Sequence, residues 1–321
     1  MRVSRRLRMA ALLAGVLAVA LSPAAQASEG LTRVLTTSPP NLPESLALDT
    51  RGNMFTSAPF AHTVLKATRS GTISTIGTFP ASTFPLGVRL DQMRNVFVAV
   101  AGSGIWEIPA AGGSPKQLVN QPGLWNGLAF DRRGNLFVSD SHAGEIWRLS
   151  KEGSFALWST SSLLLGTTAA GPCGLVHPAV PSFGPLGANG IEFNKHGDLL
   201  VANTDLGTVV RIQSNHDGSA GTASIFAGPT CDLWGADGVA IDNRDNLYVA
   251  ANSKGQIDRI DSEGELEVVA AGNPLSFPSD LAVARAGGGE SQIFISNFAA
   301  FATSAGAPGV LKMTVETEGE G

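Results

Sequence analysis

The stretch WNGLAFDRRGNLFVSD, residues 125–140, contains the pattern that decides the fold. Two alternating apolar runs flank a polar turn from Asp131 to Asn135, which is the signature of a β-hairpin. A similar phrase occurs six times along the chain, beginning at Pro43, Pro85, Trp125, Ala188, Ala236 and Pro278. Another pair of apolar runs usually follows, for example at residues 145–149 and 154–158. Each repeat therefore predicts four strands.

The spacing of the phrases indicates how the repeats are assembled. Their second residues lie 42, 40, 63, 48 and 42 residues apart, so the underlying period is near 42. Four-stranded repeats of about 40–45 residues are typical of propeller blades. The sequence thus predicts an all-β fold, a six-bladed β-propeller with four-stranded blades. Residues 31–37 are too few to form a blade, and we expect them to be the outer strand of the last blade, closing the ring.

The first 27 residues have the layout of a secretory signal peptide. An apolar run from Met9 to Leu21 precedes Ala25-Gln26-Ala27, whose small residues suit cleavage. The basic start consists of Arg2, Arg5, Arg6 and Arg8. An uncleaved anchor is the alternative, although the run is shorter than the roughly 20 residues that span a bilayer. We therefore expect a signal peptide at 1–27, a propeller at 28–314 and an acidic tail at 315–321.

Composition restricts the location and the partners of the mature chain. A cleaved signal predicts a secreted or periplasmic protein that does not bind a membrane. The net charge is −5, and loss of four arginines would bring it to about −9. This balance excludes nucleic acid as a partner, because a phosphate backbone requires a cationic surface. We expect a monomer that binds a small-molecule substrate.

The two cysteines lie in the two long steps of the repeat. Cys173 falls in an insertion at residues 161–184, and Cys231 falls in a shorter one before Asp237. Both insertions enter innermost strands from the same face, so a bridge between neighbouring blades is geometrically reasonable. Because cysteine pairs are usually bridged in oxidising compartments, we expect a disulfide. Such insertions also commonly shape the mouth of a binding site.

Equivalent positions of the phrases should meet at one end of the central channel, where the innermost strands begin. The second position of the six phrases holds Glu44, Leu86, Asn126, Asn189, Asp237 and Ser279, which we call the axial ring. Polar residues at strand starts can also simply satisfy loop backbone. Four in register, two carboxylates and two amides, do not suit an ordinary apolar core. We expect the adjacent Gly127, Gly190 and Gly238 to leave backbone room for a ligand.

The ring indicates a metal site. Oxygen donors without Cys or His suit a hard cation, Ca²⁺ first, with Mg²⁺ or Mn²⁺ as alternatives. The predicted ligands are Glu44, Asn126, Asn189 and Asp237. The Asp and Asn residues of the hairpin turns, such as Asp131 and Asn135, are turn formers to which we assign no function.

These phrases and ring residues resemble the senescence-marker-protein, gluconolactonase and luciferin-regenerating-enzyme family, and more distantly diisopropylfluorophosphatase and the paraoxonases. The resemblance covers roughly residues 31–314. It implies that Glu44, Asn126, Asn189 and Asp237 hold a catalytic Ca²⁺ or similar ion, with Asp237 as base or nucleophile. Lactonases of the family use an arginine near the blade-three asparagine to grip polar substrates. Here Leu124 and Trp125 stand there.

The chemistry that follows is ester or lactone hydrolysis, since a cation with an open site polarises a carbonyl and orients water. We predict Asp237 and His142 as catalytic residues, with His142 shuttling protons. His62 and His177 are further candidates, although an exposed loop position is the alternative for each histidine. Trp125, Trp234 and Phe277 would provide an apolar wall. The competing functions are a non-catalytic binding propeller and a lyase or synthase on the same fold.

Overall fold

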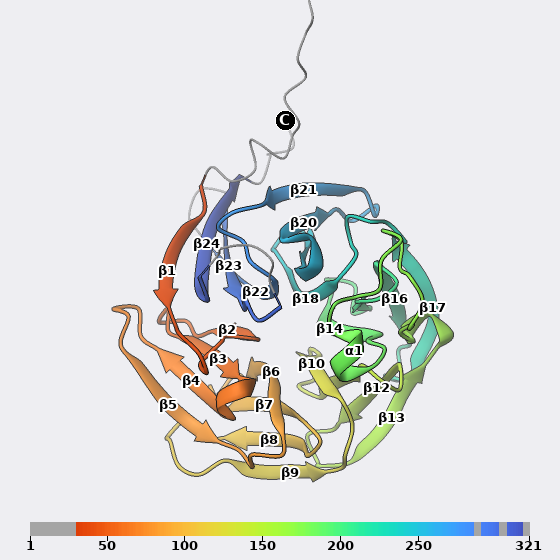
Figure 1. The fold of residues 1–321 in the computed structure, drawn as a ribbon. Helices are drawn as coiled ribbons and strands as arrows, with labels where there is room; N and C mark the ends of the chain where they lie inside the picture. The colour runs from red at the N-terminus through yellow and green to blue at the C-terminus, as the bar shows by residue number, and fades with distance from the viewer. Residues whose placement is uncertain (1–29, 286–289, 302–306, 317–321) are drawn as a thin grey trace, which may run out of the picture.

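A computed structural model describes residues 30–285, 290–301 and 307–316. The expected signal peptide and residues 317–321 of the expected tail lie outside the described residues. No helix within the described ranges is both long and apolar enough to cross a membrane. Six antiparallel sheets of four strands surround a central axis in these ranges (Figure 1), which confirms the predicted propeller.

Each sheet runs outward from an innermost strand near the axis (Figure 1). The first three blades comprise β2 (Leu46–Leu48), β3 (Met54–Ala58), β4 (Thr63–Ala67) and β5 (Ile73–Thr78); β6 (Phe84–Leu90), β7 (Val96–Ala101), β8 (Gly104–Ile108) and β9 (Lys116–Asn120); and β10 (Trp125–Phe130), β11 (Leu136–Asp140), β12 (Glu145–Leu149) and β13 (Phe155–Thr160).

The other three blades follow the same plan, and the sixth takes its outer strand from the N-terminus. They comprise β14 (Ala188–Phe193), β15 (Leu199–Asn203), β16 (Thr208–Ser214) and β17 (Ala220–Ala227); β18 (Ala236–Ile241), β19 (Leu247–Ala251), β20 (Gln256–Ile260) and β21 (Leu266–Ala271); and β22 (Pro278–Arg285), β23 (Glu290–Asn297), β24 (Gly309–Glu316) and β1 (Thr32–Thr36). Residues 315 and 316, expected to begin the tail, belong to β24.

Short helical turns occur only in the connections of the described chain. They are η2 (Pro59–Ala61), η3 (Ser162–Leu164), α1 (Val180–Phe183) and η4 (Asn252–Lys254). η2 and η4 follow the second strand of their blades, whereas η3 and α1 belong to the insertion between β13 and β14. The insertion therefore replaces a tight connection with structured chain beside the axis.

The core lies between the blades because strand side chains alternate between the two faces of a sheet. In β11, Leu136 and Val138 pack with residues of the second blade, including Ile105. Phe137 between them packs with the fourth blade, including Leu199. The period-2 pattern of the phrases thus produces one buried layer at each blade boundary, and both faces of a blade are apolar.

The N-terminal strand completes the last blade. β1 pairs antiparallel with β24, and Thr32 lies opposite Lys312. Residues of this sheet also pack against the first blade, in a buried cluster of Leu35, Leu46, Met54, Ala67 and Val310. Segments from the two ends of the described chain therefore share one sheet (Figure 1).

The hairpin turns far from the axial ring have the structural role predicted for them. Asp131 Oδ1 accepts the Asn135 backbone N–H at 2.8 Å, and its Oδ2 accepts the Asn135 side-chain amide at 2.7 Å. The first blade repeats both bonds between Asp49 and Asn53. These carboxylates are committed to closing their own turns.

Candidate metal centre and active site

A bulge at the start of the innermost strands creates the axial ring. In the third blade, Trp125 pairs with Asp140 and the next pair is Leu128 with Val138, so Asn126 and Gly127 together oppose Ser139 alone. The same shift occurs before Ile191 and before Val239. A bulge takes its residues out of the ladder and re-aims their side chains. The repeat places Asn126, Asn189 and Asp237 in this position.

The structure brings the four predicted ligands together. Glu44, Asn126, Asn189 and Asp237 all line an outer cavity and also an inner cavity of the central channel. All four side chains are buried, with exposed fractions of 4–9%. They therefore separate an outer chamber from the polar interior of the channel. Leu86 lines only the outer cavity and Ser279 only the inner one.

The ring glycines serve a different purpose from the one expected. A Cβ on Gly127 would collide with the Asn189 carbonyl oxygen, and one on Gly190 would collide with that of Asp237. Gly87 stands in the same relation to Asn126. The space that these glycines leave is filled by the backbone of the next blade rather than by a ligand. Glycine is required there because the innermost strands approach so closely.

Hydroxyl groups at the ends of the second strands orient the two amides. The Asn126 side-chain nitrogen lies 3.4 Å from Ser141 Oγ, and that of Asn189 donates to Thr204 Oγ1 at 3.0 Å. Each amide oxygen is thereby turned away from its hydroxyl partner. Ser141 and Thr204 occupy equivalent repeat positions, directly after β11 and β15. Their recurrence after the second apolar run is the sequence signal that could have identified them.

Asp237 is held by a longer chain of hydrogen bonds. The Asn252 amide donates to Asp237 Oδ2 at 2.9 Å, and Asn252 occupies the repeat position of Ser141 and Thr204. His177 Nε2 lies 3.0 Å from Asn252 Oδ1, and its Nδ1 accepts from the Ala179 backbone N–H at 3.4 Å. These contacts fit a neutral imidazole that carries its proton on Nε2. His177 thus connects the insertion to the ring through Asn252.

Burial makes the ring carboxyls resist ionisation in the absence of a cation. Desolvation raises the Asp237 pKa to about 8, with Asp280 adding repulsion, although hydrogen bonds from Asn252 and Asn189 oppose the rise. Desolvation likewise raises the Glu44 pKa well above its usual value, and Asp237 and Asp280 add to the effect. The Ser57 hydrogen bond and the charge of Arg89 oppose the rise at Glu44 without cancelling it.

A second polar layer lies deeper in the channel, and the repeat did not predict it. Asp280 stands where four of the other phrases have glycine and the first has Ser45. Its Oδ2 accepts from Ser45 Oγ at 2.7 Å and Leu46 N at 2.9 Å. Arg89 lies 3.4 Å from the same oxygen. Within the described chain, Arg89 is the one basic residue that lines the inner cavity. Arg89 is paired with Asp280 and lowers the pKa of Glu44 only in part, since that pKa stays well above its usual value.

The other predicted site residues lie in different places. His177 and Phe277 line the outer cavity, whereas His142 and His62 do not. His142 is exposed, and its Nε2 contacts the Phe183 carbonyl oxygen of α1. The expected wall residues Trp125 and Trp234 are buried but do not line this cavity.

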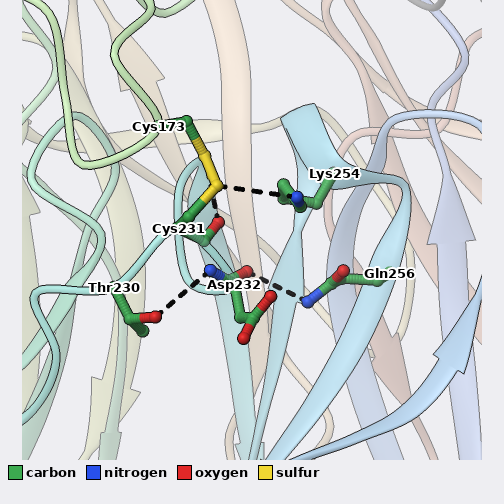
Figure 2. Close-up of a disulfide and its surroundings, with 6 residues drawn as sticks. All are labelled: Cys173, Thr230, Cys231, Asp232, Lys254 and Gln256. Atoms are coloured by element: carbon green, nitrogen blue, oxygen red, sulfur yellow. Dashed lines mark hydrogen bonds between the residues drawn. A yellow bond between two sulfur atoms is a disulfide. The ribbon is translucent and has the colours of Figure 1, made fainter. Parts of the chain in front are cut away.

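The insertion that carries His177 is fixed at two points. A disulfide joins Cys173 to Cys231, as predicted, and so links the insertion to the connection between β17 and β18 (Figure 2). Lys254 Nζ lies 3.6 Å from Cys231 Sγ. Elsewhere, Asp205 Oδ2 accepts from Thr167 N at 2.9 Å and from Leu186 N at 2.7 Å, near the two ends of the insertion.

The donor set fits a hard divalent cation. Two buried carboxylates, together with two oriented amide oxygens, are ligands that Ca²⁺ and Mg²⁺ accept. Within the described ranges, no group of three or more His, Cys, Asp and Glu side chains could hold a metal ion. The ring supplies only two carboxylates, so the amides would have to complete the coordination.

Comparison with known proteins supports the resemblance drawn from the phrases. The family model described as SMP-30/Gluconolactonase/LRE-like region matches residues 182–296. No curated protein sequence matches the chain. The chain thus resembles this family over its fourth to sixth blades.

Solved structures of similar fold cover nearly the whole chain. A gluconolactonase from Xanthomonas campestris is 17% identical with a TM-score of 0.66, and the match covers 91% of this chain and 93% of that one. Regucalcin from Agrobacterium tumefaciens, a calcium-binding protein, is 15% identical with a TM-score of 0.65, covering 89% and 95%. Virginiamycin B lyase from Staphylococcus aureus is 14% identical with a TM-score of 0.58, covering 90% and 89%. At these identities the likeness establishes the fold.

Proposed function

We propose that the protein is an exported, divalent-cation-dependent hydrolase of esters or lactones. The observation that carries the proposal is the convergence of Glu44, Asn126, Asn189 and Asp237 at the bottom of a cavity whose described lining contains no Lys or Arg. The gluconolactonase-like family match and the calcium-binding propeller of similar fold add support. Ca²⁺ is the proposed ion, with Mg²⁺ and Mn²⁺ as alternatives.

The side chains of the site have separate tasks in this proposal. When bound, the cation would polarise the ester carbonyl and orient a water molecule. Asn126 and Asn189 would offer amide oxygens whose direction is set by Ser141 and Thr204. Glu44 supplies the second carboxylate of the site. Ser57 Oγ lies 3.4 Å from Glu44 Oε2.

Asp237 is the proposed base or nucleophile. Its Oδ2 is held by Asn252, so the carboxylate keeps a fixed orientation toward the cavity. As a base it would take a proton from water as the water oxygen bonds to the acyl carbon. It would then return that proton to the leaving alkoxy oxygen as the bond from this oxygen to the acyl carbon breaks, giving a carboxylic acid and an alcohol. A catalytic role for His142 stays a prediction, and its exposed position beside α1 does not favour it.

The experiment is a screen of lactones and aryl esters with purified mature protein, in calcium and after chelation. Asp237→Asn and Glu44→Gln should abolish turnover, because each removes a carboxylate ligand while keeping shape. Asp258→Asn is the matched control, since Asp258 is a buried carboxyl outside the ring. Turnover that survives chelation and both ring substitutions would overturn the proposal.

Export rests on the first 27 residues. We infer that they direct the chain out of the cytoplasm, and the Cys173–Cys231 disulfide is consistent with an oxidising destination. Expression of the full-length gene should yield a product that starts at Ser28 in the extracytoplasmic fraction. A full-length chain retained in the cytoplasm would contradict this.

Elimination is a second candidate reaction, and the observation that favours it is the buried His177 in the wall of the same cavity. To remove a proton from carbon, His177 would use Nδ1, which would have to give up its 3.4 Å contact with the Ala179 backbone N–H while Nε2 stays bonded to Asn252. The product distinguishes the two reactions. Hydrolysis adds the mass of one water to the substrate, whereas elimination leaves the total mass unchanged and creates a carbon–carbon double bond.

A further inference from the structure

The outer cavity has an apolar wall above its polar floor. Phenyl rings line it from several directions: Phe60 in η2, Phe84 in β6, Phe183 in α1, and Phe277, Phe298 and Phe301 around the sixth blade. Leu86, Leu124 and Leu186 complete the wall on the remaining sides. The floor is the ring of candidate ligands, so the polar groups are confined to one end of the cavity.

The rings form a connected set rather than isolated contacts. Phe60 stacks on Phe298 with centroids 5.8 Å apart and an interplanar angle of 3°. Phe301 contacts Phe277 at 5.4 Å and Phe183 at 6.0 Å. Contacts of this kind hold flat surfaces at fixed angles. The insertion and the sixth blade therefore build one aromatic surface over the ring.

Polar partners for a ligand occur on a single side of the wall. Besides the four candidate ligands, His177 and Asn252 are the polar side chains among the described residues that line this cavity. Both are already engaged, since His177 contacts Asn252, which donates to Asp237. No Lys, Arg, Ser or Thr from the described chain lines the outer cavity. A polyhydroxylated ligand would leave its hydroxyls unpaired, which costs roughly tenfold or more in binding for each one.

The ring itself is apolar on the side of the second blade. Leu86 replaces a polar residue there and lines the outer cavity together with Phe84. A substrate whose carbonyl points to the floor would therefore direct its organic part over the second blade and along the phenyl rings. The side of the second blade is therefore the direction in which the organic part of a substrate would meet apolar side chains next to the ring.

We propose, resting on the proposed hydrolase function, that the substrates are hydrophobic: aryl esters or lactones with alkyl or aryl substituents, and not sugar-acid lactones. In an alkyl series each added methylene is expected to raise kcat/KM about fourfold until the cavity is filled. The preference is set by the wall, so it should be separable from the metal and from Asp237.

The test measures kcat/KM for phenyl acetate, for γ-lactones of increasing alkyl length and for glucono-δ-lactone. Each substrate is assayed with the wild-type protein and with two variants. Phe60→Ser is suitable because Phe60 is 38% exposed and is not needed for the buried layers. It should lower kcat/KM for the aryl and alkyl substrates roughly three- to tenfold. Met93→Ser, at a side chain 72% exposed outside this cavity, is the control and should change nothing. A preference for glucono-δ-lactone, or an unchanged profile in Phe60→Ser, would overturn the inference.

Binding of phenylacetamide, an amide that resists hydrolysis, separates this inference from the proposed reaction. Calorimetry should detect binding to the wild type and to Met93→Ser, and weaker binding to Phe60→Ser. If no ester or lactone is hydrolysed but this pattern is seen, the hydrolase proposal fails and the hydrophobic specificity stands. If glucono-δ-lactone is hydrolysed and phenylacetamide does not bind, the specificity fails and the hydrolase proposal stands.

Discussion

Asn252 provides the sharpest test of how the ring is held, because it contacts both Asp237 and His177. Replacing it with alanine removes the 2.9 Å hydrogen bond to Asp237 Oδ2 and leaves His177 Nε2 without its acceptor. A hydrogen bond to a charged group is worth about 1.5–3 kcal/mol, and 1.4 kcal/mol is a tenfold change. Asn252→Ala should therefore weaken calcium binding by about ten- to a hundredfold, the range found for partners of metal ligands.

The pH dependence of binding should move with the affinity. The Asn252 hydrogen bond lowers the Asp237 pKa, so its loss raises that pKa further above the ordinary value. Calcium requires the ionised carboxylate, so affinity rises as pH passes upward through the pKa. In Asn252→Ala this rise should occur at higher pH than in the wild type. Calorimetric calcium titrations at several pH values measure both effects.

Asn297→Ala is the matched control for this experiment. Asn297 is also a buried asparagine near the end of a second strand, but its amide donates to the Pro274 and Ala307 carbonyls. The control should lose stability and keep the wild-type calcium affinity. If Asn252→Ala binds calcium as tightly as the wild type, or loses no more affinity than Asn297→Ala, then Asn252 does not hold a metal ligand and the reasoning is refuted.

Three further predictions concern stability. The double variant Cys173→Ser, Cys231→Ser should lower the free energy of unfolding by up to about 4 kcal/mol, because the disulfide closes a long loop with a sequence separation of 58. Urea titrations measure this, and a variant as stable as the wild type would contradict it. Burial raises the Asp258 pKa to about 8, so the folded state holds a proton that the unfolded state releases near pH 4. Wild-type stability should thus fall between pH 4 and 8 by at most about 1.4 kcal/mol per unit, and Asp258→Asn should gain relative stability as pH rises, which melting curves measure. Arg89→Met should lower the free energy of unfolding by roughly 3–5 kcal/mol, because it leaves Asp280 buried without its cation. Adding Asp280→Asn to this variant should restore part of the lost stability. An Arg89→Met variant as stable as the wild type would argue against a stabilising Arg89–Asp280 pair.

The repeat made the fold and the ring predictable. Trp125 to Asp140 encodes a hairpin by its alternation and its turn, and six copies at a period near 42 define the blades. Equivalent positions must then meet at the axis, which is why the sequence alone predicts that Asn126 and Asp237 lie together. The structure adds the physical cause, since a bulge aims these positions away from the ladder.

The wall of the cavity could not be predicted in the same way, because its residues lie outside the repeated phrase. His177 and Phe183 belong to the insertion, whose path depends on the disulfide and Asp205 and on no periodic signal. His142 likewise lies in a loop after the repeated phrase, so the repeat does not determine where its side chain points. In the structure it is exposed beside α1 and does not line the outer cavity. Trp125 was expected there from its proximity in sequence, but neighbours along a strand point to opposite faces, and its side chain packs between blades.

Asp280 shows that a departure from the repeat can carry information. It occupies a glycine position of the phrase, and its carboxylate bonds to the first blade and to Arg89 of the second. A charged residue in a glycine position could have been noticed in the alignment of the phrases. Its partner Arg89 could not, because nothing in the sequence indicates which blade faces it.

Calcium binding by the mature protein tests the central claim most directly. Calorimetry and calcium-dependent melting should show about one equivalent bound to the wild type and a higher Tm, with both effects lost in Glu44→Gln and in Asp237→Asn. Without calcium the variants should melt no lower than the wild type, because each replaces a buried carboxyl whose pKa is raised. If the wild type binds no divalent ion, or if both variants bind calcium as it does, the axial ring is not a metal site and the account is contradicted.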